Sequence, residues 1–285
     1  MTTTPLRVHT TVRAADGAPL EACTAGDPRH PAVVIAPACG MPVALSGPWI
    51  SALAAHFYVI TWETRGLSAA DTLTPGQFDT LGDDATTQAD DLLRVLDHFA
   101  VERAHAAGFC GGATTALQAA AAQPDRLSSL SLWHGDFRFP AEDTTAHQRN
   151  LDAILAMAAQ SRATARELLT MLRQLISSQA PPHLAEHLLH PYATPERFYR
   201  YSRLNTALTA TDLAPLLPHV TAPALVVTAT TDTTTHPAGS RAAARLLPAA
   251  RLAEAAEGAH LDTFEATPPH RALLAAFLAA HERAR

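Results

Sequence analysis

The chain has 285 residues, of which 47% are apolar and 17% charged, so it can bury one large core as an enlarged domain or a domain with an insertion. The formal net charge is −6 and every basic residue is an arginine, without clustering, which argues against a nucleic-acid-binding surface. No apolar run is long enough to cross a membrane and residues 1–5 do not resemble a signal peptide, so neither a membrane partner nor secretion is expected.

The cysteines point to free thiols. Cys23, Cys39 and Cys110 are odd in number and have no C-x-x-C spacing, and a chain of this size needs no disulfide framework. We therefore expect a protein of the reducing cytoplasm, with neither a metal nor a bound cofactor.

The predicted elements begin with an antiparallel hairpin and continue as a parallel sheet. Residues 6–13 and 19–24 alternate around a turn at Asp16-Gly17. Short apolar runs then predict strands buried on both faces of a sheet, at residues 32–36, 57–62, 104–109, 127–133 and 223–228. Helical spacing at 83–99 and 113–122 lies between them, which predicts an α/β fold with a mostly parallel sheet flanked by helices.

A long helical segment interrupts this pattern. After residue 138 the strands stop, and the apolar residues follow helical spacing. We expect a helical cap (lid) over residues 139–215, inserted into a sheet domain formed by residues 1–138 and 216–285. We expect most of its apolar and aromatic side chains to pack within the cap. The alternative is that they line an apolar pocket over Cys110; the aromatic candidates are Phe139, Phe198, Tyr199 and Tyr201.

The sharpest chemical signal is the run Gly108-Phe109-Cys110-Gly111-Gly112. It follows a predicted strand and precedes a predicted helix, which is the context of a nucleophile elbow, where flanking glycines permit a strained turn. A thiol at this point would lie at a helix N-terminus, whose dipole and free N–H groups favour the reactive thiolate. A buried cysteine in a tight glycine turn is the alternative interpretation.

A thiolate nucleophile needs a base, and the base needs an orienting acid. His260 is the candidate base, because it follows the short apolar segment 249–253 and precedes a final predicted helix, 269–282. Asp232 and Asp136 are both candidate acids, since each follows a predicted strand at the same edge of the sheet. Sequence spacing alone does not choose between them.

The order of these elements resembles the α/β-hydrolase superfamily along nearly the whole chain. The opening hairpin, the turn at residues 62–66 and the order of elbow, acid and histidine all match. The resemblance implies that the backbone N–H of Gly111 and of Ala38 or Cys39 form the oxyanion hole. The chain departs from the family pattern in two places. Pro37-Ala38-Cys39-Gly40 stands where the oxyanion loop usually has His-Gly, and Cys110 stands where the elbow usually has serine.

Two cysteine-bearing branches of the superfamily are similar to this chain. Dieckmann cyclases of tetramate and pyridone biosynthesis imply a Cys-Asp-His triad whose acid follows the elbow by less than thirty residues, which favours Asp136 slightly over Asp232. Dienelactone hydrolase has a similar Gly-x-Cys-x-Gly elbow, but those enzymes are compact, and the long helical insertion argues against that assignment.

The cysteine also bears on the reaction. Exchange between a thioester substrate and an enzyme thioester is nearly neutral in energy, and it keeps the acyl carbon activated for acceptors other than water. We expect acyl transfer on a thioester, most simply a Dieckmann-type cyclisation that releases a polyketide or aminoacyl chain from an acyl or peptidyl carrier protein. A thioesterase, an ester or lactone hydrolase, and a non-catalytic small-molecule-binding protein of the same fold are the alternatives.

Three arginines near the end of the predicted cap, Arg197, Arg200 and Arg203, are spaced three residues apart. This spacing predicts a solvated helical face. The alternative is a contact with the phosphopantetheine phosphate or an acidic helix of a carrier protein.

Overall fold

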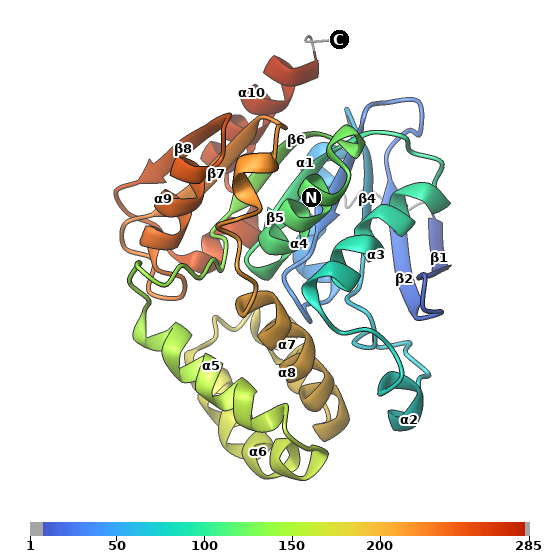
Figure 1. Ribbon diagram of the computed structural model, residues 1–285, viewed down its shortest axis with the longest axis vertical. Coiled ribbons are helices and arrows are strands. Elements are labelled where there is room, and N and C mark those ends of the chain that lie inside the picture. Colours follow the sequence, from blue (N-terminus) through green and yellow to red (C-terminus); the bar gives the residue numbers. More distant parts are fainter. Residues whose placement is uncertain (1–7, 283–285) are drawn as a thin grey trace.

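The computed structural model describes residues 8–282 and has an eight-stranded sheet at its centre (Figure 1). The strands are β1 (Val8–Arg13), β2 (Pro19–Ala25), β3 (Ala32–Ala36), β4 (Tyr58–Trp62), β5 (Ala104–Phe109), β6 (Leu127–Trp133), β7 (Ala224–Ala229) and β8 (Ala250–Ala255). They lie in the order β1-β2-β4-β3-β5-β6-β7-β8, antiparallel as far as the β2–β4 pair and parallel from β4 to β8. The predicted strands and the mostly parallel sheet are confirmed, while Leu6 and Arg7 of the predicted hairpin lie outside the described residues.

Helices connect the strands and cover the sheet. The α-helices are α1 (Gly47–Leu53), α2 (Pro75–Phe78), α3 (Ala85–His98), α4 (Gly111–Ala122), α5 (Ala146–Ala158), α6 (Arg162–Gln179), α7 (Ala185–Leu189), α8 (Pro195–Thr209), α9 (Pro237–Leu246) and α10 (Pro268–Glu282). None of these helices, within the described part of the chain, is both long and apolar enough to cross a membrane.

The strands are buried on both faces because successive side chains point to opposite sides. Val34 and Ala36 of β3 pack in the core formed with α3, α4 and α9, whereas Val33 and Ile35 pack in the core formed with α1 and α10. This explains why the strands read as unbroken apolar runs.

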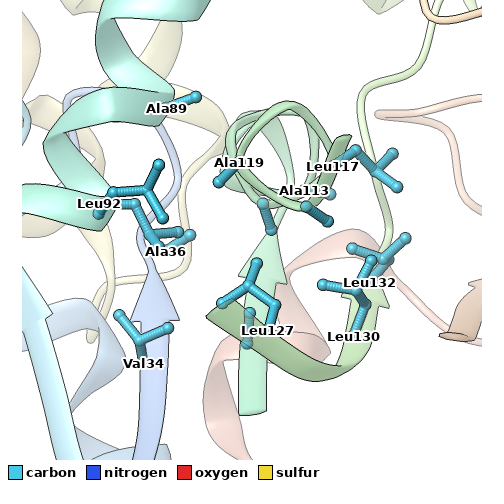
Figure 2. Packing of buried hydrophobic residues seen from close by; sticks show 14 of the residues in the cluster. Val34, Ala36, Ala89, Leu92, Ala113, Leu117, Ala119, Leu127, Leu130 and Leu132 are labelled. Carbon is cyan, nitrogen blue, oxygen red and sulfur yellow. The ribbon is translucent and has the colours of Figure 1, made fainter. Parts of the chain in front are cut away.

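Helix α4 packs closely on the sheet because its inner face is made of small residues. Figure 2 shows Ala113 and Leu117 of this helix above Leu132 of β6, and Ala119 directed toward Leu92 of α3. All five residues are 0% exposed. Burial of each leucine is worth about 1.5–3 kcal/mol, so this contact fixes the start of α4, where the elbow lies.

Helices α5 to α8, which we call the inserted helices, lie between β6 and β7 in the chain and are grouped together below the sheet in Figure 1. They share a hydrophobic core, to which Leu155, Leu169 and Phe198 contribute and which also includes residues of the sheet domain such as Phe78. The aromatic residues expected to pack within the cap divide between two cores: Phe198, Tyr199 and Tyr201 belong to this one, and Phe139 belongs to the core beside α4. Residues 134–223 contain no strand.

One of the three arginines of α8, Arg200, is not part of the expected solvated face. Arg200 is 4% exposed, is paired with Asp71 and with Glu196, and donates to the carbonyl oxygens of Gly66 and Leu73 at 3.1 and 2.7 Å. The prediction is therefore wrong for Arg200. One of its carboxylate partners, Asp71, lies in the segment before α2. The spacing of the arginines cannot indicate a contact with this distant segment.

Glycines 112 and 111 differ sharply in the space around them. A Cβ on Gly112 would lie 2.5 Å from the carbonyl oxygen of Pro37 and would also clash with that of Ala36, whereas a Cβ on Gly111 meets nothing closer than 3.5 Å. We expect Gly112→Ala to lower the free energy of unfolding by about 1–3 kcal/mol, because the obstacle is backbone. Gly111→Ala should change it by less than about 1 kcal/mol. Urea unfolding of both variants checks this, and equal effects would contradict it.

Candidate active site

Cys110 stands at the carboxyl edge of the sheet in a strained turn. It joins β5 directly to α4, with φ 50° and ψ −120°, a conformation that is rare for a residue with a side chain. Its backbone N–H donates to the carbonyl oxygen of Trp133 at 3.0 Å, which anchors the turn to β6. Its side chain is partly exposed, unlike those of Cys23 and Cys39, which are buried. The elbow that the sequence predicts is therefore present.

His260 and Asp232 meet at the same edge. Asp232 follows β7, and His260 begins the 3₁₀ helix His260–Glu265 after the neighbouring strand β8. His260 Nδ1 lies 3.1 Å from Asp232 Oδ2, and His260 is 5% exposed. Since an ionised carboxylate only accepts, Nδ1 carries the proton of this bond and Nε2 is left for Cys110.

The Asp232 carboxylate is completely enclosed and fully hydrogen-bonded. Its side chain is 0% exposed. His134 Nδ1 lies 2.6 Å from Oδ2, and the Thr235 hydroxyl donates to the same oxygen at 2.9 Å. The backbone N–H groups of Thr234 and Thr235 donate to Oδ1 at 2.8 and 3.1 Å. These donors compensate the desolvation of the charge and fix its orientation.

Electrostatics favour charged forms of both His260 and Asp232. Burial acts to lower the pKa of His260, but the negative charge of Cys110 and the Asp232 carboxylate outweigh it and raise the pKa to about 10. Burial acts to raise the pKa of Asp232, but hydrogen bonds from His134 and His260 hold it well below its usual range. At neutral pH the arrangement is therefore an imidazolium beside a carboxylate, with the positive ring next to Cys110.

Asp136 has different partners, so the slight preference for this residue is corrected by the geometry. It forms an ion pair with Arg138, and Gln148 Nε2 donates to its Oδ1 at 2.8 Å. Gln148 is on α5, so the carboxylate ties the loop after β6 to the inserted helices. The aspartate that contacts His260 is Asp232.

The predicted oxyanion residues lie beside the elbow. As the first residue of α4, Gly111 has an N–H with no acceptor inside the helix. The Cβ atom of Cys39 lies 3.6 Å from where a Cβ on Gly111 would be, so the turn after β3 faces the start of α4. In that turn, the Gly40 N–H is occupied by the Thr64 hydroxyl at 3.0 Å, and Ala38 accepts from Met41. Burial raises the pKa of the Cys39 thiol, so we interpret Cys39 as a small side chain that fills space beside the elbow rather than as a second nucleophile.

Comparisons with known proteins identify the fold family of the chain. Residues 31–267 match the alpha/beta hydrolase fold family. The chain belongs to this family. A protein of Caulobacter vibrioides named as the carbamate hydrolase RutD is 26% identical over 228 residues, which cover 80% of this chain and 82% of RutD.

Two lactonases are also similar. The 3-oxoadipate enol-lactonase 1 of Acinetobacter baylyi is 28% identical over 118 residues, or 41% of this chain and 42% of that protein. The crystal structure of the enol-lactonase from Burkholderia xenovorans superposes with a TM-score of 0.75 at 22% identity, covering 95% of this chain and all (100%) of that one. At this identity the superposition supports the fold alone.

His134 is a site residue of this α/β hydrolase that the sequence analysis did not single out. It shares the Asp232 carboxylate with His260, and the two imidazole rings lie edge to face with centroids 5.6 Å apart. A backbone φ of 46° aims its side chain at Asp232. The available signal was its position directly after Trp133, at the end of a predicted strand beside the elbow.

The same three side chains have the spacing of a metal site. Donor atoms of His134, Asp232 and His260 lie within 4.8 Å of one another. Both Nδ1 atoms, however, contact a single carboxylate oxygen at hydrogen-bonding distance, 2.6 and 3.1 Å. The arrangement is that of two donors on one acceptor, which suits the orientation of a catalytic histidine.

The two aspartates can be separated by matched substitutions. Asp232→Asn removes the charge that stabilises the His260 imidazolium, so we expect a rate loss on the order of 10³ to 10⁴ for acylation by p-nitrophenyl acetate. Asp136→Asn should lose less than about tenfold, because this carboxylate contacts Arg138 and Gln148. Stopped-flow release of p-nitrophenol measures both rates. An inactive, folded Asp136→Asn beside an active Asp232→Asn would reverse the assignment.

Alkylation of Cys110 by iodoacetamide should report the charge on His260. Because the pKa of His260 is raised to about 10, its positive charge persists through neutral and mildly alkaline pH and favours negative charge on the neighbouring sulfur. His260→Gln removes this charge and should slow alkylation throughout a pH profile from about 7 to 9. Cys23 and Cys39 are slow internal controls, since burial raises the pKa of both thiols. Superimposable profiles would contradict the pairing.

Proposed function

We propose that this α/β hydrolase is an acyl-transfer enzyme in which Cys110 carries the acyl group as a thioester. The observation that supports this most strongly is the position of His260, which is hydrogen-bonded to Asp232 and close enough to Cys110 for that residue to affect the pKa of the imidazole. It places nucleophile, proton carrier and orienting acid in the order that acyl transfer requires. Asp232 is the orienting acid, and the N–H groups of Gly111 and of Ala38 or Cys39 bind the oxyanion.

In the first half-reaction the Cys110 thiolate attacks the acyl carbon. A bond forms between Sγ and that carbon, and the bond to the leaving thiol or alcohol breaks as the leaving group takes a proton from the His260 imidazolium. The thioester that results is neutral. Acylation therefore removes the charge on Cys110 that contributes to raising the pKa of His260, so the pKa falls.

In the second half-reaction His260 acts as a base. Neutral after the first step, it accepts a proton from the acceptor, which then attacks the acyl carbon and releases Cys110 as the thiolate. The charge on the sulfur returns and the imidazolium is stabilised again. One histidine thus serves first as an acid and then as a base, with the charge on Cys110 controlling the change.

The acceptor that we propose is a carbon acid within the same acyl chain, as in a Dieckmann-type cyclisation. A thioester keeps the acyl carbon activated until an acceptor other than water attacks it. The near-complete burial of His260, 5% exposed, and the approach of Leu208 to within 3.5 Å of a Cβ placed on Gly111 support limited access of water. In this proposal residues 139–215 form the cap, and the acyl group arrives as a small thioester or on a carrier protein.

Hydrolysis is a second candidate, which the comparisons favour. The relatives are named as a carbamate hydrolase and an enol-lactonase, and both names describe hydrolytic reactions. With water as the acceptor, the same residues release a free acid. The two candidates therefore share the acyl-enzyme and differ in the second half-reaction alone.

Product analysis distinguishes the two candidates. Given a β-ketoacyl aminoacyl thioester, the protein should release a cyclic tetramate or pyridone whose mass is one water below that of the free acid. Mass spectrometry of the products decides, and free acid as the main product from several such substrates would establish a thioesterase instead.

Variants of the nucleophile test the covalent step. Cys110→Ala should remove both the acyl adduct and turnover. Cys110→Ser should lose at least about 100-fold in rate and shift residual product toward the free acid, because water attacks an oxygen ester more readily. Intact-mass measurement of the acylated protein checks the adduct. Turnover by folded Cys110→Ala would end the covalent mechanism.

A further inference from the structure

Asn205 on α8 is a buried polar residue whose carboxamide is unused. It is 7% exposed, and its side chain makes no hydrogen bond with any residue between 8 and 282. Amides of largely buried residues usually have partners. The carboxamide of Asn205 keeps a little accessible surface, because neither of its polar atoms is among the fully buried, unpaired atoms of residues 8–282. By contrast Ser202, on the same helix and 0% exposed, donates to the carbonyl oxygen of Phe198 at 2.8 Å.

The carboxamide lies beside the oxyanion residues. Asn205 Oδ1 is 3.8 Å from the position that a Cβ on Gly111 would take, and the Cys39 Cβ is 3.6 Å from the same point. Gly111 and Cys39 belong to the two segments whose N–H groups are proposed to bind the oxyanion. The amide therefore lies near the place where these two segments meet, and one of them includes Gly111, which follows Cys110 in the chain.

Helix α8 is fixed in the orientation that puts Asn205 there. Tyr201, one helical turn earlier, packs against Gly40, with its Cδ2 atom 2.7 Å from the position of a Cβ on that glycine. Leu208, almost one turn later, lies beside Gly111. Gln88 Nε2 on α3 donates to the carbonyl oxygen of Leu204 at 3.0 Å. Contacts on either side of Asn205 thus hold this face of α8 against the elbow.

We propose that the Asn205 carboxamide turns over about its terminal bond, which brings Nδ2 to the place of Oδ1, and donates an N–H hydrogen bond to the carbonyl oxygen of the acyl group that reacts with Cys110. It would thus be a third oxyanion donor, supplied by the inserted helices. The inference rests on the acyl-enzyme proposed above. No proton is transferred: the bond strengthens as negative charge develops on the oxygen and weakens when the carbonyl re-forms. A neutral amide suits this position because it leaves the charges of Cys110 and His260 unopposed.

The test uses p-nitrophenyl acetate, because the acetyl group offers one carbonyl oxygen and no other polar group. Asn205→Leu keeps a similar volume without a donor, and Asn205→Asp replaces the amide with a charge that repels the oxyanion. We expect the acylation rate constant to fall about 100-fold or more in Asn205→Leu, and further in Asn205→Asp. The thermal midpoint of Asn205→Leu should not fall, because an apolar side chain replaces an unpaired amide. Ser202→Ala is the matched control and should acylate within about threefold of the wild-type rate.

The outcomes separate this inference from the proposed function. If the wild-type protein gains an acetyl group on Cys110 but Asn205→Leu acylates at the wild-type rate, the role of Asn205 is refuted and the acyl-enzyme stands. Equal losses in Asn205→Leu and Ser202→Ala would also refute it, since they would indicate a general effect of disturbing α8. If the wild-type protein gains no acetyl group on Cys110, the proposed function fails and this inference with it.

Discussion

The site depends on one buried negative charge, the carboxylate of Asp232. Removing a carboxylate from water costs several kcal/mol unless charged or polar donors surround it. Here those donors are two imidazoles, a hydroxyl and two backbone N–H groups. They come from the loop after β6, the turn after β7 and the start of the 3₁₀ helix after β8. Satisfying this charge therefore brings together three connections that are far apart in the chain.

The charge on Asp232 also determines what His260 can do. With the carboxylate on one side and Cys110 on the other, the pKa of His260 is raised to about 10 despite burial, so the ring is protonated in the free protein. The pKa of His260 therefore depends on the chemical state of the Cys110 sulfur. When the sulfur is acylated, one of the two negative partners is lost and the histidine becomes a better base. An exposed histidine would not respond so strongly, because water would screen both partners.

Local features of the fold were accessible from the sequence. The parallel strands are buried on both faces, so they read as apolar runs. Gly108 and Gly112 mark the elbow because other parts of the backbone approach both residues closely. The order of strands also placed His260 correctly at the carboxyl edge. Each of these features depends on neighbours in the chain or on the regular alternation of strand and helix.

The remaining features depend on contacts between distant segments. Asp136 and Asp232 both follow strands at the same edge of the sheet. The sequence could not indicate that Asp136 binds Arg138 and Gln148 while Asp232 binds two histidines. The direction of the His134 side chain depends on a positive φ. The position of Asn205 depends on how the inserted helices dock, and no periodicity within α8 reveals it.

The charge state of His260 before and after modification of Cys110 tests the central claim most directly. NMR of the histidine ring nitrogens distinguishes imidazolium from neutral imidazole, and His260→Gln identifies the signals. At about pH 8, above the ordinary histidine pKa, the account predicts an imidazolium in the free protein and a lower pKa for the ring once iodoacetamide has capped Cys110. A His260 ring that is neutral at this pH in the free protein, or whose pKa is unchanged by capping, would contradict it.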